Sequence, residues 1–357
     1  MSNWFDWFKP ITSAVSLLTA CCGCTAYSGP VSSHFDGSRF FNPEREDHSP
    51  GDTVKWLWEM DTVDWPEWVD DPPQPPPPER TEPGILRVTF VNHATVLLQI
   101  DGINILTDPI WSKRAGPISW LGVKRVRAAG VPFARLPRID VVLISHDHYD
   151  HLDAPTIDML WRRDRPRFFV GLGVGEQLRA LGVPARSVTE LDWWQEHVLA
   201  GTSVRILFAP ARHSSGRGLF SEGRTLWGGF LIDTAGGQVY FAGDTGLGAF
   251  VDEIAARFHR IRLAILPVGS YEKRWFMKTQ HLNPEDAVLV HRKLQARQSM
   301  GIHYGTFAEH PEQSIDAHER DLAAALASQA IDPSLFWLLG FGEGRDVSRH
   351  SIDVESE

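Results

Sequence analysis

Short apolar runs recur along the chain from residue 85 onward, and most have the length of β-strands. The Asp101-Gly102 pair between two of these runs is a strong signal for a hairpin turn. The continuous apolar run at 139–145 is typical of a strand buried on both faces. The pattern predicts strands at 85–91, 95–100, 103–108, 139–145, 167–171, 204–210, 226–233, 238–244, 264–269, 299–305 and 336–340.

Helical spacing of apolar residues appears between these strands, at 154–163, 284–294 and 312–330. Pro284 stands at the start of the second of these segments, where a helix tolerates proline. Because strands dominate and helices lie between them, the pattern predicts an α/β domain of layered sheets covered by helices.

The first 84 residues differ from the rest. Residues 11–20 are apolar but too short to span a bilayer, and they suit a signal peptide. Leu18-Thr19-Ala20-Cys21 is similar to a bacterial lipobox, which predicts a signal peptide at 1–21 and a lipid on Cys21. An N-terminus with incidental cysteines is the alternative. Residues 22–84 are interpreted as a tether containing a Trp-rich stretch at 54–68 and a proline-rich spacer at 71–80.

Composition narrows the possible partners. The net charge of -10 over 357 residues leaves no general basic surface for nucleic acid. The 3 cysteines all lie within 21–24, so the fold does not depend on disulfides. A lipidated Cys21 would place the chain in a bacterial cell envelope, and Cys22, which is not aspartate, favours the outer-membrane or periplasmic side.

The densest chemical signal is His146-x-His148-x-Asp150-His151, directly after the predicted strand at 139–145. Imidazole and carboxylate groups suit zinc and similar divalent ions, although a charged turn is the plain alternative. His213, Asp244 and His303 also follow predicted strands. All of these side chains could therefore meet at one rim of the sheets.

This ordered set resembles the metallo-β-lactamase superfamily. A closer resemblance, covering roughly residues 38–345, is to the N-acylphosphatidylethanolamine-hydrolysing phospholipase D family. It is carried by RFFNP (39–43), HATVLLQIDGINILTDPIW (93–111), ISHDHYDHLD (144–153), ELDWW (190–194), FAGDTG (241–246), PVGSYEKRWFMKTQHLNPEDAV (267–288) and IHYGTFA (302–308). It implies an αββα sandwich, two mixed β-sheets flanked by helices, over 85–345, followed by a polar tail at 346–357.

The same resemblance implies two zinc ions per chain. The first would bind His146, His148 and His213, and the second Asp150, His151 and His303. Asp244 and a hydroxide would bridge them. The hydroxide would attack a phospholipid phosphodiester and yield phosphatidic acid and an N-acylethanolamine. His281 matches a family histidine near the reacting phosphate, where it would hold a phosphoryl oxygen or protonate the leaving group.

Several other residues are candidates with open alternatives. Asp108 is expected either to orient a ligand histidine or to form a turn, and the role of His93 is open. Asp147 and Tyr149 are expected to point away from the metals. The residues expected to line an acyl groove, with core packing as the alternative, are Trp193, Trp194, Trp275, Phe276 and Met277.

A phospholipid substrate requires contact with a membrane surface, for which Cys21 and the Trp-rich stretch are candidates. The family resemblance also makes a homodimer an expectation. Two other functions stay open from the sequence: an ester or lactone hydrolase on the same fold, and a lipoprotein that binds lipid or metal without catalysis.

Overall fold

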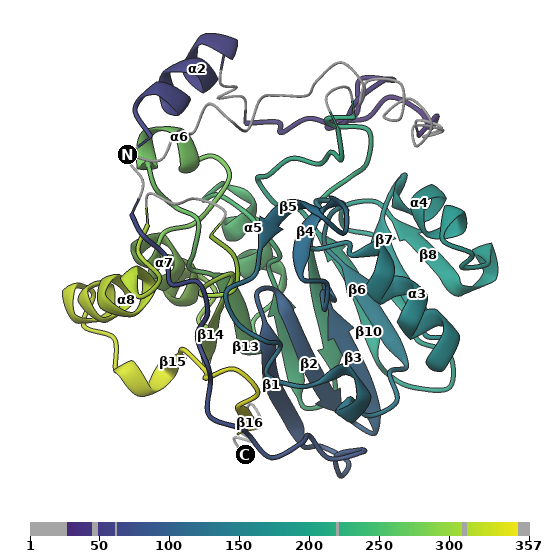
Figure 1. Ribbon diagram of the computed structural model, residues 1–357. Helices are drawn as coiled ribbons and strands as arrows, with labels where there is room; N and C mark the ends of the chain where they lie inside the picture. The colour runs from purple at the N-terminus through teal and green to yellow at the C-terminus, as the bar shows by residue number, and fades with distance from the viewer. Residues whose placement is uncertain (1–26, 45–48, 61–62, 219–220, 309–312, 349–357) are drawn as a thin grey trace.

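A computed structural model describes residues 27–44, 49–60, 63–218, 221–308 and 313–348. Two seven-stranded sheets lie at its centre, with helices on both outer sides (Figure 1). The predicted signal peptide, Cys21 and residues 349–357 of the predicted tail lie outside the described residues. Among the described helices, none has both the length and the apolar character needed to cross a membrane.

The first sheet is antiparallel from β16 to β3 and parallel from β3 to β8. Its order is β16 (Gly344–Val347), β1 (Leu86–Asn92), β2 (Thr95–Ile100), β3 (Ile103–Thr107), β6 (Val141–Ile144), β7 (Arg167–Gly171) and β8 (Val188–Leu191).

The second sheet is antiparallel from β9 to β12 and parallel from β12 to β15, so both sheets are mixed. Its order is β15 (Phe336–Trp337), β14 (Ser299–Ile302), β13 (Ile261–Pro267), β12 (Gly237–Phe241), β11 (Gly229–Thr234), β10 (Arg205–Ala209) and β9 (Glu196–Val198). The predicted sandwich of two mixed sheets is confirmed.

Helices α3 and α4 lie beside the first sheet, and α5, α7 and α8 lie beside the second (Figure 1). A separate hairpin, β4 (Arg114–Ile118) and β5 (Leu121–Lys124), belongs to neither sheet. The helices are α2 (Pro50–Trp58), α3 (Ala154–Arg163), α4 (Val174–Ala180), α5 (Phe250–Arg257), α6 (Arg274–Met277), α7 (Pro284–Lys293) and α8 (Ala317–Ser328), with 3₁₀ turns at Phe133–Arg135, Ala185–Ser187 and Pro333–Leu335.

Local sequence explains the best-defined boundaries. Asp101 and Gly102 both have positive φ, 49° and 76°, as a two-residue turn of the mirror-image type requires, so β2 and β3 pair as a hairpin. Asn283 caps α7 by accepting a hydrogen bond from the Asp286 backbone, and Pro284 occupies the first turn. The hairpin and the proline at the start of α7 confirm the sequence predictions.

Strand β6 illustrates how the core is divided. Val141 and Leu143 belong to the apolar cluster between the two sheets, whereas Val142 and Ile144 belong to the cluster beneath α3 and α4. Both faces of this strand are therefore buried, which explains its continuous apolar sequence. The strand is fixed from both sides just before the chain enters the segment 146–151.

The tether interpretation of residues 22–84 is wrong for part of this range. Phe35 and Phe40 are 1% and 4% exposed and belong to the main core cluster. Within the described part of the chain, a regular helix, α2, already precedes residue 85. Apolar side chains at irregular spacing gave no helix or strand signal here, yet they pack against the sandwich.

Candidate metal centre

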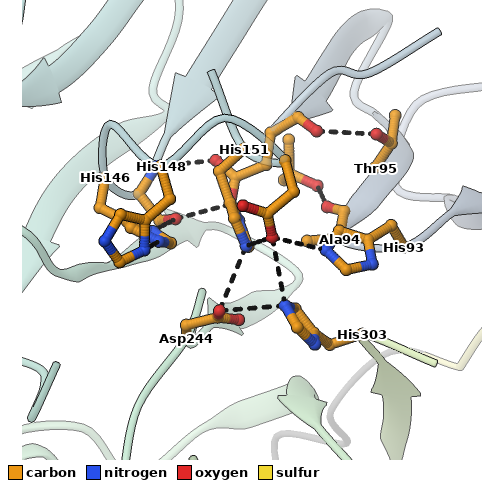
Figure 2. Close-up of polar contacts among 12 residues, drawn as sticks. His93, Ala94, Thr95, His146, His148, His151, Asp244 and His303 are labelled. Carbon is orange, nitrogen blue, oxygen red and sulfur yellow. Dashed lines mark hydrogen bonds and ion pairs between the residues drawn. The ribbon is translucent and has the colours of Figure 1, made fainter. Parts of the chain in front are cut away.

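The predicted ligands come from strand ends on both sheets. The segment His146–His151 follows β6 of the first sheet, and His213, Asp244 and His303 follow β10, β12 and β14 of the second. Figure 2 shows side chains from both sources around one centre, with Asp244 and His303 facing the His146–His151 segment. The structure thus brings together all seven predicted ligands.

A first group of donor atoms consists of three histidine nitrogens. The Nδ1 atom of His148 lies 2.9 Å from His146 Nε2 and 3.3 Å from His213 Nε2. These atoms all lie within 4.8 Å of one another. They are the three residues predicted for the first metal.

A second group contains the other predicted set and one additional histidine. His151 Nε2 and His303 Nε2 lie 2.9 Å and 3.5 Å from Asp150 Oδ2. His93 completes this group, whose donor atoms also lie within 4.8 Å of one another. His93 Nε2 is 2.8 Å from the same Asp150 oxygen, so this histidine positions a predicted ligand.

Asp244 lies between the two groups. Its Oδ2 atom is 3.0 Å from His303 Nε2 and 3.2 Å from His151 Nε2. The same oxygen is 3.9 Å from His213 Nε2 of the first group. This position fits a carboxylate shared by two cations.

The donor chemistry fits divalent metal ions. His151 Nε2 and Asp244 Oδ1 are buried and make no hydrogen bond in the described structure, despite the close carboxylate contacts of His151. Buried polar atoms normally have partners, so these atoms are suited to coordination. Imidazole nitrogen with carboxylate oxygen suits zinc, and iron or manganese also accept such a set.

The far side of each ring is held in place. His151 Nδ1 donates to Asp108 Oδ2 at 2.7 Å, and His213 Nδ1 lies 3.0 Å from the Gln280 carbonyl oxygen. Ser145 Oγ donates to Asp108 and lies 2.9 Å from His146 Nδ1. These contacts direct Nε2 of all three rings toward the centre. The expectation that Asp108 orients a ligand histidine is confirmed.

Backbone conformation also sets the geometry. Asp108, His93 and His303 have φ values of 33°, 47° and 64°, in a region that residues other than glycine seldom occupy. A Cβ atom added at Gly269 would lie only 1.7 Å from the His303 carbonyl oxygen. Glycine at 269 is therefore required for the close approach of the His303 turn.

Charge states follow from burial and proximity. Burial lowers the pKa of His213 to about 3 and that of His146 well below its usual value. Burial opposes charge on Asp244, but His151 and His303 hold the pKa of its carboxyl well below the usual range. Burial likewise opposes charge on His151, but Asp150, Asp244 and Asp108 raise its pKa well above 6.5. His146 and His213 are thus neutral imidazoles and Asp244 is an ionised carboxylate, whereas the surrounding carboxylates keep His151 protonated until a cation would replace that proton.

Comparison with known proteins agrees with this geometry. Residues 103–304 match the family model of the β-lactamase superfamily domain, which is more than half of the chain. The chain belongs to this superfamily. An N-acyl-phosphatidylethanolamine-hydrolyzing phospholipase D 1 of Caenorhabditis elegans is 40% identical over 232 residues, covering 62% of this chain and 64% of the relative.

A mitochondrial protein of the same name from Saccharomyces cerevisiae is 34% identical over 231 residues, covering 62% of this chain and 47% of the relative. The chain spans less than two thirds of the length of either relative. A metallo hydrolase of Ignicoccus hospitalis has the same fold, with a TM-score of 0.54 at 21% identity over 73% of this chain and 98% of that one. This superfamily member therefore shares its fold with a metallo hydrolase.

His281 lies beside the shared carboxylate. Its Nδ1 atom is 3.9 Å from Asp244 Oδ2, and its ring lies 5.3 Å from that of His213. Its backbone is held by Met277 and Arg274, which join it to α6. Asp244, His281 and His303 also form a group that could hold an ion. This placement is consistent with the prediction that His281 lies near the reacting phosphate.

Trp193 and Trp194 do not border the metal donors. Trp193 stacks on His34 at 4.3 Å, and the Arg257 guanidinium lies 3.8 Å from the Trp194 ring centre. They line a cavity of about 270 Å³ together with residues of the 27–44 segment and α5, and none of the seven ligand residues lines it. The same cavity is lined by Arg212, which directly precedes His213, so an acyl-binding role for Trp193 and Trp194 stays a prediction.

The aromatic side chains of α6 are partly covered by α2. Phe276 stacks on Trp56 at 5.1 Å, and Lys55 Nζ lies 4.6 Å from the Trp275 ring centre. Met277 is 4% exposed. An acyl-binding role for Trp275, Phe276 and Met277 stays a prediction.

Residues between the ligands connect two loops. Asp147 accepts hydrogen bonds from the Gly216 backbone and from Gln177, and Tyr149 donates to the Arg217 carbonyl. Arg217 in turn donates to the Asp147 carbonyl. The expected outward direction of Asp147 and Tyr149 agrees with these contacts. Sequence analysis missed Arg217, since a lone arginine in a loop carries no pattern.

Proposed function

We propose that this chain is a phospholipase D-type phosphodiesterase that hydrolyses N-acylphosphatidylethanolamine or a related phospholipid, with two zinc ions bound. Water would add to phosphorus while the bond from phosphorus to the ethanolamine oxygen breaks. The products would be phosphatidic acid and an N-acylethanolamine. The observation that carries this proposal is the pair of donor groups sharing Asp244, in a chain similar to two proteins of that name.

The charge of the centre favours an anionic substrate. Two dications would bring +4, and Asp150, Asp244 and the ionised water would bring -3, which leaves +1 at the centre. A phosphodiester carries one negative charge and would offset this excess. A neutral lactone or carboxylic ester would offset none of it, which favours the phosphodiester.

Two bound cations would supply a water that ionises near neutral pH and positive charge facing the phosphoryl oxygens. Asp150 and Asp244 would hold them, while Asp108, Ser145 and the Gln280 carbonyl fix the rings of their histidine ligands. His281 would donate a hydrogen bond to a phosphoryl oxygen or a proton to the departing alcohol oxygen.

The deciding experiment measures products from vesicles containing N-acylphosphatidylethanolamine in water enriched in ¹⁸O. We expect equimolar N-acylethanolamine and phosphatidic acid, with the label only in the phosphate. The matched control is Asp244→Ala, which should form neither product. Elemental analysis should find two zinc ions per wild-type chain. Label in the alcohol, release of free fatty acid, or faster turnover on a lactone panel would contradict the proposal.

The remaining expectations about location stay part of this proposal. A lipid on Cys21, an outer-membrane or periplasmic position, contact with a membrane surface and a homodimer would all suit an enzyme of membrane lipids. Cys21 lies outside the described residues, so its acylation is supported only by the lipobox-like sequence.

A further inference from the structure

The β4–β5 hairpin presents an apolar tip to the outside. Ile118 and Leu121 pair across the hairpin and are 45% and 37% exposed, and Trp120 in the turn between them is 72% exposed. Large apolar side chains gathered on an exposed turn indicate an interaction surface rather than a folding requirement.

The base of this hairpin is fixed next to the metal centre. Ala115 packs with Ile110 and Phe307, and Val123 and Tyr149 pack against that cluster. Tyr149 stands between the ligands His148 and Asp150. The hairpin stands at the end of the molecule where α2 and α6 also lie (Figure 1). The tip therefore projects from the part of the surface that surrounds the centre.

Basic residues flank the apolar tip. The segment 113–124 contains Lys113, Arg114 and Lys124 and no acidic residue, although the whole chain has a net charge of -10. Arg114 and Lys124 face each other across the ladder, and the exposed Glu67, 3.7 Å from Lys124, offsets only part of this like charge. Both lysines are exposed. Positive charge at the base and apolar side chains at the tip complement the phosphate layer and the acyl layer of a lipid surface.

A neighbouring tryptophan extends the same surface. The Val69 backbone donates to the Val126 carbonyl, and Glu67 lies 3.7 Å from Lys124, so residues 67–69 run alongside β5. Trp68 in this segment is 47% exposed. Indole rings favour the boundary between headgroups and acyl chains.

We infer that the hairpin 113–124 inserts its tip, Ile118–Leu121, into a phospholipid surface that carries anionic lipids, and so presents the metal centre to headgroups. This inference rests on the proposed function for its purpose, but binding to lipid can be measured without turnover. Insertion would leave Lys113 and Lys124 at the depth of the phosphates.

The test compares vesicle binding of the full chain and of Ile118→Ser/Trp120→Ser, with Cys21→Ser in both so that no acyl chain contributes. Vesicles consist of phosphatidylcholine alone or with phosphatidylglycerol. We expect the double variant to bind mixed vesicles at least about tenfold more weakly, since two large apolar side chains lose burial. Met159→Ser/Val198→Ser removes two exposed apolar side chains elsewhere and should bind like the parent.

Charge and catalysis provide two further measurements. Lys113→Gln/Lys124→Gln should remove most of the preference for vesicles containing phosphatidylglycerol. Turnover of the hairpin double variant should fall on vesicle substrate and stay within about twofold on soluble bis(p-nitrophenyl) phosphate.

Unchanged vesicle binding by the tip variant would overturn the inference, as would a parallel loss on the soluble diester. If the parent chain showed no phosphodiesterase activity, the proposed function would fail. The vesicle-binding result would still decide the role of the hairpin.

Discussion

At the scale of single residues, the geometry of the metal centre depends on side chains that are not themselves predicted ligands. Asp108 is not one of the seven predicted ligands, but its carboxylate accepts from His151 Nδ1 and from Ser145. Since Ser145 Oγ also contacts His146 Nδ1, one buried carboxylate fixes a ring in each donor group. The two cation positions are thereby coupled through Asp108 as well as through Asp244.

The role of His281 in the reaction can be determined by comparing substrates with different leaving groups. If it protonates the departing alcohol, His281→Ala should lower turnover of an alkyl phosphodiester by about 10²–10⁴-fold. The same variant should turn over a p-nitrophenyl diester almost normally, because nitrophenolate leaves without a proton. Turnover of both diesters and the bound metal content are measured for wild type and variant.

Equal losses of turnover on both diesters would instead indicate that His281 donates a hydrogen bond to a phosphoryl oxygen. Unchanged turnover on both, with unchanged metal content, would remove it from the reaction. Arg274, whose guanidinium donates to the His281 carbonyl, is not altered in this comparison, so the backbone at 281 keeps its anchor.

The seven predicted ligands could be expected at one edge because each follows an apolar strand, and the family resemblance then assigned them to two metals. The residues that hold these ligands in position could not be predicted. Ser145 and Gln280 act through a neighbouring ring and a backbone carbonyl, and such contacts leave no periodicity. His93 was recognised only as lying near the rim, because its contact with Asp150 spans 57 positions.

At the scale of elements, the central strands were predictable and most of the edge strands were not. β6 is buried throughout and forms a continuous apolar run, and β13 is buried throughout and apolar except for Arg262. The edge strands β8, β9 and β16 are mostly half-buried or exposed, and they show neither a run nor an alternation. Residues 27–44 pack through a few aromatic side chains, which a search for regular elements passes over.

Helix α8 supports the turn that carries a ligand. His318 on this helix stacks on Tyr304 at 4.3 Å, and Tyr304 directly follows His303. Burial and then the charge of Arg127 lower the pKa of His318 to about 4, against the opposing effects of Asp316 and Asp321. The stack therefore contains a neutral ring at neutral pH.

This ring should make stability depend on pH. Between pH 6.5 and 4 the unfolded chain protonates His318 and the folded chain does not, so unfolding takes up a proton and stability falls as pH falls. We expect His318→Phe, which keeps the stack, to lose about 2 kcal/mol less unfolding free energy between pH 7 and pH 5 than wild type. Urea unfolding at both pH values measures the difference.

The exposed His259 provides the matched control, and His259→Phe should follow wild type. Identical pH dependence of wild type and His318→Phe would show that His318 does not remain neutral in the folded chain. Metal content has to be the same in all samples, since buried ligand histidines also respond to pH.

At the scale of the whole molecule, the centre joins the two sheets. The first sheet contributes the His146–His151 segment, and the second contributes His213, Asp244 and His303. Bound cations would therefore add a link between layers that already meet through apolar packing and hydrogen bonds such as that from the Gly216 backbone to Asp147. Metal binding to the folded chain alone should raise its stability.

Removing metal should lower the thermal midpoint of the whole domain. At a metal concentration about 100 times the dissociation constant, one site contributes about 2.7 kcal/mol, which for a chain of this size is about 4 °C. Scanning calorimetry of zinc-loaded and chelator-dialysed protein measures the shift, and added zinc should reverse it.

Asp244→Asn should show a smaller shift because both positions lose a shared ligand. Ile118→Ser/Trp120→Ser should keep the full shift, since neither residue is a metal donor. An equal thermal midpoint of the wild-type chain with and without zinc would mean that the donors do not hold a cation. The proposed hydrolytic centre would then need another explanation.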